Sequence, residues 1–316
     1  MKDLDFTVIV PTHNRSERLT RTLGSIEAQT LRPDQYEIVV VANNCTDDTV
    51  TVVEQRSAHS RCALRVTEET KVGPSAARNR GIREARARWC AFIDDDMTVA
   101  PGWLAAFAGV LAPHGDSHPA IACGRNDVVF VGGRPPWLAD PILDLFGGIY
   151  HPPTARRIRY PSIVPSGNFA CHRALFSLVG FFDERFSRAD AEDAELSYRV
   201  MYRGIPAYWV HDALAYHYVD TDRLTREQVR ARAEEFGGVR PVLFAGVPSR
   251  LARTGWQALD IALFGAAYVR ALVMQHGSRL AGRPDLEFAY QCKRSYGEGY
   301  LRALLGREPA DPRAPP

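Results

Sequence analysis

Short apolar runs alternate with helix-like segments through the first hundred residues, and this alternation constrains the fold more than any other feature. The runs are rich in β-branched residues and end in turn-forming residues, so they are predicted to be buried strands. They lie at Phe6–Val10, Glu37–Val41, Leu64–Val66 and Cys90–Ile93. Strands that alternate with helices indicate an α/β fold with a parallel sheet and right-handed crossovers.

The fourth run leads directly into three acids, Asp94, Asp95 and Asp96. Open parallel sheets bind ligands outside the carboxyl ends of their strands. Three neighbouring carboxylates repel one another, and a divalent cation with hard oxygen ligands offsets that repulsion. The alternative is an acidic turn that only caps a following helix, with Asp96 or Thr98 at the cap. The triplet alone leaves both interpretations open.

The composition is that of an ordinary globular protein. The 316 residues are 46% hydrophobic and 24% charged, and a formal net charge of +2 gives no bias toward nucleic acid. The six cysteines have no CxxC or zinc-like spacing and the N-terminus does not resemble a signal peptide, so we expect free thiols in the cytoplasm. The apolar stretch Ile261–Met274 is interrupted by Arg270, and it is too short and too charged to predict a membrane span.

The pattern changes after Pro101. A long region from Gly124 to Pro165, rich in Gly, Pro and aromatic residues, is predicted to be irregular and functional. Two short strands are predicted at Tyr208–Val210 and Ala213–Tyr218, and the chain is predicted to be helical from Leu224 onward.

Seven segments occur together in one order. They are VIVPTHNR (8–15), EIVVVANNCTDDT (37–49), ARNRGI (77–82), FIDDD (92–96), SGNFACHRALFSLVGFFDERF (166–186), AEDAELSYRV (191–200) and ALAYHY (213–218). In this combination the chain resembles the inverting, nucleotide-sugar-dependent glycosyltransferases of family 2, which have the GT-A fold. The resemblance covers roughly residues 6 to 220.

The resemblance implies a domain organisation. Residues 1–222 would form a GT-A glycosyltransferase domain, with a nucleotide-binding half at 1–100 and an acceptor-binding half at 101–222. A C-terminal helical extension at 223–308 and a disordered tail at 309–316 would follow.

The resemblance also implies a donor site that holds a nucleotide sugar and Mg or Mn. Asp96 would ligate the metal on the diphosphate, Asp94 would contact ribose or metal, and His217 would complete the metal site. Asp95 would point to the opposite side if the segment stays extended. The residues expected to bind the nucleotide are Pro11, Thr12, Asn14, Asn43, Asn44, Lys71, Arg78, Asp94 and Asp95.

The catalytic base implied by the resemblance is Asp193, next to Glu192. A carboxylate within hydrogen-bond reach can take the proton of an acceptor hydroxyl as that hydroxyl attacks the anomeric carbon. Without the resemblance, the same acids are typical of a solvated first turn of a helix. The acceptor, a carbohydrate or another small molecule with a hydroxyl group, is expected near Trp137, Gly167 and Asn168.

Two features complicate this interpretation. The family usually has an acid where this chain has Ala42, and that acid typically bonds the uracil imide, so UDP is only the default nucleotide and Asn43 or Asn44 is a candidate substitute. Asp94-x-Asp96-x-Thr98-Val99 also fits the motif of haloacid-dehalogenase-like phosphatases, in which Asp94 would be the nucleophile. A catalytically inactive glycosyltransferase-like binding module is the non-enzymatic alternative.

The helices after Leu224 are basic and amphipathic. They are compatible with peripheral contact at the inner face of a membrane or with a homodimer.

Overall fold

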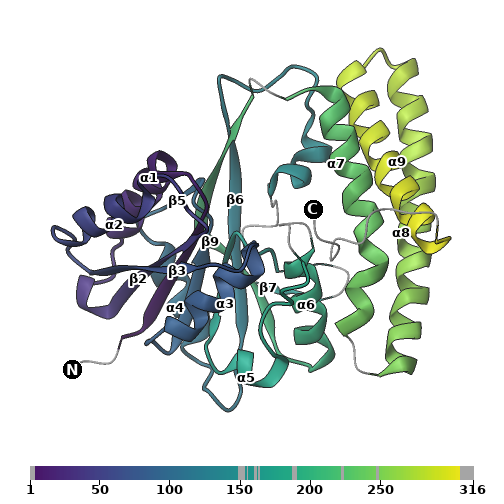
Figure 1. Ribbon diagram of the computed structural model, residues 1–316. Coiled ribbons are helices and arrows are strands. Elements are labelled where there is room, and N and C mark those ends of the chain that lie inside the picture. Colours follow the sequence, from purple (N-terminus) through teal and green to yellow (C-terminus); the bar gives the residue numbers. More distant parts are fainter. Residues whose placement is uncertain are drawn as a thin grey trace. The chain divides into compact units, whose positions relative to one another are not determined.

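A computed structural model describes residues 4–148, 154, 156–159, 162, 164–186, 191–221, 224–246 and 249–306. The chain forms two compact units (Figure 1). Unit 1 contains residues 1–127 and 150–217, and unit 2 contains residues 128–149 and 218–316. The division does not follow the boundary predicted at residue 222, because residues 128–149 group with the C-terminal helices. The tail predicted at 309–316 lies outside the described residues.

Strands of both orientations form one sheet in the order β3-β2-β1-β4-β8-β6-β9-β5, with β7 paired to β9. The first four strands in this order are parallel, as predicted, whereas β8 pairs antiparallel with β4 and with β6. The strands are β1 (Phe6–Thr12), β2 (Tyr36–Asn43), β3 (Ala63–Glu69), β4 (Trp89–Ile93), β5 (Met97–Val99), β6 (Ile121–Val131), β7 (Arg156–Arg157), β8 (Asn168–His172) and β9 (Ala207–Asp220).

Helices of unit 1 cover the sheet on both faces. They are α1 (Ser16–Glu27), α2 (Thr49–Ser57), α3 (Pro74–Glu84), α4 (Trp103–Leu111), α5 (Leu175–Val179) and α6 (Glu192–Tyr202), with a 3-10 turn η1 (Pro33–Gln35). The apolar stripe of α1 and the buried face of α4 share one core with Val8 and Val10 of β1. On the opposite face α3 approaches β1 closely: a Cβ added at Gly81 would lie 2.4 Å from Cγ2 of Ile9. The absence of a side chain at Gly81 therefore allows α3 to approach β1 this closely.

Two local predictions were wrong, and one alternative interpretation is excluded. Residues 121–131 form β6 and residues 140–146 form the 3-10 helix η2 (Asp140–Phe146), although 124–165 was predicted to be irregular. Much of β6 is half-buried on both faces, so its sequence lacks a regular alternation. The two strands predicted between 208 and 218 are one strand, β9, which continues through His211 and Asp212. The segment after the acids forms β5 rather than a capped helix, because Met97–Val99 pairs with β9.

Unit 2 is mainly helical, as predicted from Leu224 onward. It contains η2, α7 (Arg226–Val239), the 3-10 helix η3 (Arg240–Gly246), α8 (Arg250–Leu280) and α9 (Pro284–Leu304). Thr225 and Gln228 form a capping box at the start of α7. Apolar residues of η2, α7 and α9 share a core of their own, including Phe146, Val229 and Phe288.

Candidate functional site

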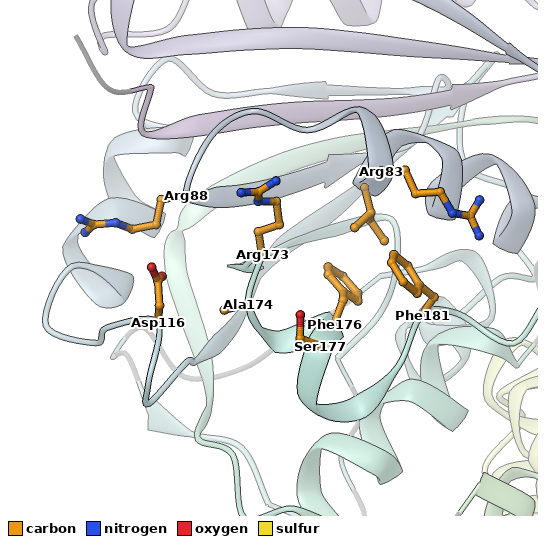
Figure 2. Close-up of a pocket in the computed structure, with 9 residues that line it drawn as sticks. Arg83, Arg88, Asp116, Arg173, Ala174, Phe176, Ser177 and Phe181 are labelled. Carbon is orange, nitrogen blue, oxygen red and sulfur yellow. The ribbon is translucent and has the colours of Figure 1, made fainter. Parts of the chain in front are cut away.

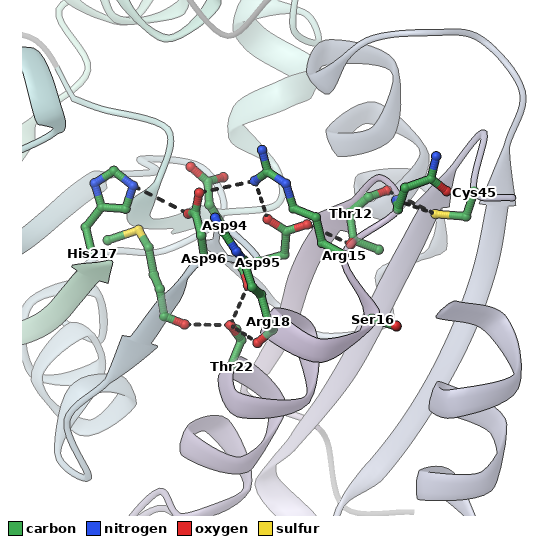
Figure 3. Close-up of polar contacts among 12 residues, drawn as sticks. Thr12, Arg15, Ser16, Arg18, Thr22, Cys45, Asp94, Asp95, Asp96 and His217 are labelled. Carbon is green, nitrogen blue, oxygen red and sulfur yellow. Dashed lines mark hydrogen bonds and ion pairs between the residues drawn. The ribbon is translucent and has the colours of Figure 1, made fainter. Parts of the chain in front are cut away.

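The acids after β4 lie close to Arg15 and His217, and Asp95 and Asp96 share Arg15 as a partner (Figure 3). A tight turn follows β4, in which the Met97 amide donates to the Asp94 carbonyl over 3.2 Å. Oδ1 of Asp96 lies 3.5 Å from Nε2 of His217, because β5 and β9 pair Met97 directly with His217. Burial opposes ionisation of Asp96, but the hydrogen bond and charge of His217 together with Arg15 outweigh it and lower its pKa. Asp96 and His217, which lie far apart in sequence, therefore converge on one point.

The segment is not extended at Asp95, which lies in the turn and shares Arg15 with Asp96. Asp95 is 4% exposed, and its carboxylate accepts hydrogen bonds from Thr12 (2.7 Å) and Arg15 (3.0 Å). Burial raises the pKa of Asp95, and Arg15 and Thr12 oppose that rise. Both carboxylate oxygens of Asp95 thus have protein partners that hold the ends of β1 and β4 together, and its binding of nucleotide stays a prediction.

Arg78 lies between Asp94, which follows β4, and Glu192, at the start of α6. Its side chain is only 2% exposed and projects from α3, with Nη2 2.9 Å from Oδ1 of Asp94 and Nη1 2.8 Å from Oε1 of Glu192. The Nε atom of Arg78 is buried without a hydrogen-bond partner. The structure therefore places Arg78 between the acids, where its positive charge compensates two carboxylates. Its predicted contact with the nucleotide is not tested.

Asp193 lies at the start of α6, beside the ion pair of Glu192. Its Oδ2 accepts a hydrogen bond from the Ser166 amide (3.1 Å), and the Ser166 hydroxyl donates to Glu192 (3.1 Å). Burial, followed by the charge of Glu192, raises the pKa of Asp193 to about 7. A carboxyl group with a pKa near neutrality is suited to general-base catalysis at physiological pH.

Gly167 and Asn168 connect Asp193 to the acids after β4. A Cβ at Gly167 would lie 2.8 Å from Oδ2 of Asp94, so a side chain there would collide with that carboxylate. Asn168 is fully buried, and its amide bonds the indole N–H of Trp103, the Ala213 carbonyl and Asn126. The side-chain amide of Asn168 is thus bonded within the protein, and its contact with an acceptor stays a prediction.

The predicted nucleotide-binding loops lie at the ends of β1, β2 and β3. Pro11 lies within β1, and Asn14, with a positive φ of 52°, accepts a 2.7 Å hydrogen bond from the Thr46 amide and so ties the first loop to the second. Lys71 is 58% exposed and pairs with Glu184 over 2.7 Å. These positions surround the edge at which the three acids emerge.

The two asparagines considered as substitutes for the missing acid differ. The amide of Asn43 is fully used, since it donates to the carbonyls of Glu69 and Lys71 and accepts from the Gly73 amide. Asn44 has a positive φ of 51°, and its Nδ2 is buried without a partner. Of the two asparagines, only Asn44 has a side-chain donor without a partner among the residues that the structure describes.

Arg15 was not nominated from the sequence. Its Nη1 contacts both Asp95 (3.0 Å) and Asp96 (3.2 Å) while its side chain stays 47% exposed. A charge count could have found it, because three adjacent acids need compensation and Arg15 belongs to the first of the loops at this edge. Trp137, by contrast, belongs to unit 2, where its ring packs edge-on against Phe288 at 5.2 Å, and its contact with an acceptor stays a prediction.

Within the described part of the chain, no group of three His, Cys, Asp or Glu side chains is gathered around one point. The donor set is nevertheless chemically suited to Mg²⁺ or Mn²⁺, since Mg²⁺ commonly takes only one or two carboxylates and completes its shell with substrate phosphates and water. Asp96 supplies a carboxylate and His217 an imidazole nitrogen, the type of ligand that transition metals accept.

A separate pocket of about 480 Å³ lies elsewhere in unit 1 and contains none of the nominated residues (Figure 2). It is lined by Arg83, Arg88, Asp116 and Arg173 together with Phe176 and Phe181, near the start rather than the end of β4. We therefore place the candidate site at the edge where the acids emerge and not in this pocket.

Comparison with known proteins identifies the family of this chain. The model of glycosyl transferase family 2 matches residues 7–179, more than half of the chain. A validoxylamine A glucosyltransferase from Streptomyces hygroscopicus subsp. limoneus is 32% identical over 221 residues, covering 63% of this chain and 48% of that relative. A pre-mycofactocin glycosyltransferase from Mycobacterium tuberculosis is 27% identical and covers 90% of this chain and 56% of its own length. The chain thus spans about half the length of these relatives.

Solved structures share the fold. A mannosyltransferase from Pyrobaculum calidifontis, in complex with GDP-Man and Mn²⁺, aligns with a TM-score of 0.62 at 21% identity, covering 98% of this chain and 89% of its own. S. aureus TarS 1–349 in complex with UDP-GlcNAc aligns with a TM-score of 0.54 at 19% identity, covering 96% and 93%. These likenesses confirm the predicted GT-A architecture, and the extent of the family match shows that this chain belongs to glycosyl transferase family 2.

Proposed function

We propose that this protein transfers a sugar from a nucleotide-diphospho-sugar to an acceptor hydroxyl in one step, with inversion at the anomeric carbon. The observation that carries the proposal is the position of Asp193, a carboxyl group with a pKa raised to about 7, next to Glu192, which two ion pairs of Arg78 connect to Asp94. A base of this strength is ionised at slightly alkaline pH and accepts the acceptor's proton during attack.

In this proposal one group of residues accepts the proton and another group holds the metal. Asp193, in its ionised form, receives the proton of the acceptor hydroxyl, and the Ser166 amide fixes the orientation of its carboxylate. Asp96 and His217 would hold Mg or Mn, which neutralises the charge that develops on the departing diphosphate. Arg78 keeps Asp94 and Glu192 in place, and Arg15 lies where it can balance charge beside Asp96.

The nucleobase is proposed to contact Asn44. Ala42 is 2% exposed and carries no acid, and the amide of Asn43 is fully used within the protein. The buried Nδ2 of Asn44 can donate to a base carbonyl, and a donor left unpaired on burial costs about 1 to 3 kcal/mol. UDP remains the default nucleotide from the family resemblance, and because guanine and thymine also carry a carbonyl, the contact with Asn44 does not select among these bases.

Calorimetric titration with UDP, GDP, dTDP and ADP, each with Mn²⁺ and with EDTA, tests the donor site. We expect one nucleotide to bind in a metal-dependent way, Asp96→Asn to lose that binding, and Asp193→Asn to keep it. Donor consumption would then be measured with validoxylamine A as the first acceptor and UDP-glucose as the first donor, since a relative is named for that glucosyl transfer. Asp193→Asn should abolish transfer, and near-normal turnover would refute the assignment of the base.

The two alternatives give different results in the same experiment. A catalytically inactive binding module would bind a nucleotide without transfer to any acceptor. The phosphatase alternative needs the acidic motif after the first strand, whereas Asp94 follows β4, and membership of family 2 leaves that alternative without support. Cytoplasmic location, a homodimer and peripheral membrane contact stay predictions.

A further inference from the structure

Helix α8 has one covered side and one uncovered side. The helix runs over 31 residues from Arg250 to Leu280, and Asp260, Ala271 and Ser278 form a buried stripe along it. This side packs beside α9 within unit 2 (Figure 1). The segment 253–280 is long and apolar enough to cross a membrane by length and composition, yet only 11% of its most apolar window is buried.

The uncovered side is apolar along most of the helix. Leu259, Ile261, Leu263, Val269 and Val273 are 47%, 46%, 40%, 58% and 65% exposed, and we call these five residues the apolar face of α8. Isolated exposed apolar residues are normal on a protein surface, but a contiguous set along one helix marks an interaction site.

The exposed charged side chains of α8 are all positive. Its only acid, Asp260, is fully buried and forms an ion pair with Arg240 over 2.8 Å, so it contributes no negative charge to the surface. Arg250, Arg270 and Arg279 are exposed, and none of the three forms an ion pair within the described part of the chain. The surface of α8 therefore combines apolar side chains with positive charge and presents no carboxylate of its own.

The width of the exposed arc distinguishes a lipid surface from a second copy of this chain as the partner of α8. Leu272, Val273 and Met274 are consecutive and are 39%, 65% and 39% exposed. Successive residues of a helix point about 100° apart, so these three sample an arc of roughly 200°. A helix from a second copy covers a stripe roughly 100° wide. Lipid acyl chains can cover the whole arc, and anionic headgroups would pair with the arginines.

We propose that α8 docks onto an anionic lipid surface, lying in the interfacial plane with its apolar face among the acyl chains and Arg270 reaching the headgroups. The packing of the opposite side on α9 favours a helix that lies on the membrane over one that crosses it alone. This inference does not depend on sugar transfer, and its test uses no nucleotide.

The test is flotation of the full chain with vesicles of phosphatidylcholine, with and without phosphatidylglycerol. We expect wild-type protein to float with the anionic vesicles, and Leu259→Glu/Val273→Glu to lower the bound fraction at least tenfold. Leu178→Glu on α5 is the matched control, because Leu178 is 46% exposed against 47% for Leu259, and it should float like wild type. Arg270→Gln should weaken binding about fivefold at low salt.

Circular dichroism and size-exclusion chromatography with light scattering would accompany each variant. Wild-type protein that does not float with anionic vesicles would overturn the proposal, as would a double variant that floats equally well. A wild-type dimer that the double variant converts to a folded monomer, without flotation of either, would show that a second copy covers the face instead.

Discussion

Replacing Asp193 by Asn should stabilise the fold at pH 8 but not at pH 5. The folded protein raises the pKa of this carboxyl from 3.8 to about 7, because it is buried and lies beside Glu192. Between these two values the folded state binds more protons than the unfolded state. The free energy of unfolding of the wild-type protein therefore falls as the pH rises toward 7, and the Asn variant lacks this contribution.

The size of the effect follows from the shift. One pKa unit corresponds to about 1.4 kcal/mol, so between pH 5 and pH 7 the variant should gain roughly 2 to 3 kcal/mol relative to wild type. Above the pKa of about 7 the difference should level off. The amide has one oxygen where the carboxylate accepts from both Ser166 and Ala194, so a lost hydrogen bond subtracts about 1 kcal/mol at every pH.

Urea unfolding at pH 5, 6, 7 and 8, followed by tryptophan fluorescence, measures this difference. Trp103 and Trp209, both fully buried in unit 1, should report its unfolding. Asp48→Asn is the control, because Asp48 is exposed at the start of α2, and its effect should not change with pH in the same way. A stability difference for Asp193→Asn that is equal at pH 5 and pH 8, or that shrinks, would refute the reasoning.

Three further outcomes are expected. The ratio kcat/KM should rise with pH through about 7 as Asp193 loses its proton, and a flat profile from pH 6 to pH 8 would count against its role as base. Arg78→Met should lower the free energy of unfolding by about 3 to 5 kcal/mol in urea titrations, because the buried Glu192 loses its partner, and a change below about 1 kcal/mol would contradict this. Gly81→Ala should cost about 1 to 3 kcal/mol by thermal denaturation, because the added methyl group overlaps Ile9. Gly109→Ala, on α4 with nothing within 4 Å, should instead stabilise by up to about 1 kcal/mol, and equal effects of the two would refute the packing argument.

Much of the fold of residues 1–100 could be predicted because several of its strands are buried on both faces. Continuous apolar runs such as Phe6–Val10 and Glu37–Val41 are typical of strands buried on both faces of a parallel sheet. Acids that directly follow such a strand lie at the edge of the sheet. The length of β9 could not be predicted, since His211 and Asp212 interrupt its apolar pattern at half-exposed and exposed positions. Local pattern does not show that pairing with β5 and β7 sustains the strand.

The contacts of the site depend on pairing between distant segments. Asp96 and His217 meet because β5 and β9 are in register, and Arg78 reaches Glu192 across 114 residues of sequence. Sequence alone places the acids but cannot assign their partners, so it could not show that Arg15 faces two of them or that Asn168 is fully used inside the sheet.

Gly167 limits which substitutions this chain can accept beside Asp94. Any side chain at that position would meet the Asp94 carboxylate at 2.8 Å, so a mutation there changes the donor acids before it changes what lies on the other side of the loop. Selection for new acceptors therefore has little freedom at Gly167, even though it neighbours the Ser166 amide that binds Asp193, the proposed base. A mutant library aimed at new acceptors should keep this glycine fixed and randomise loops that do not contact Asp94.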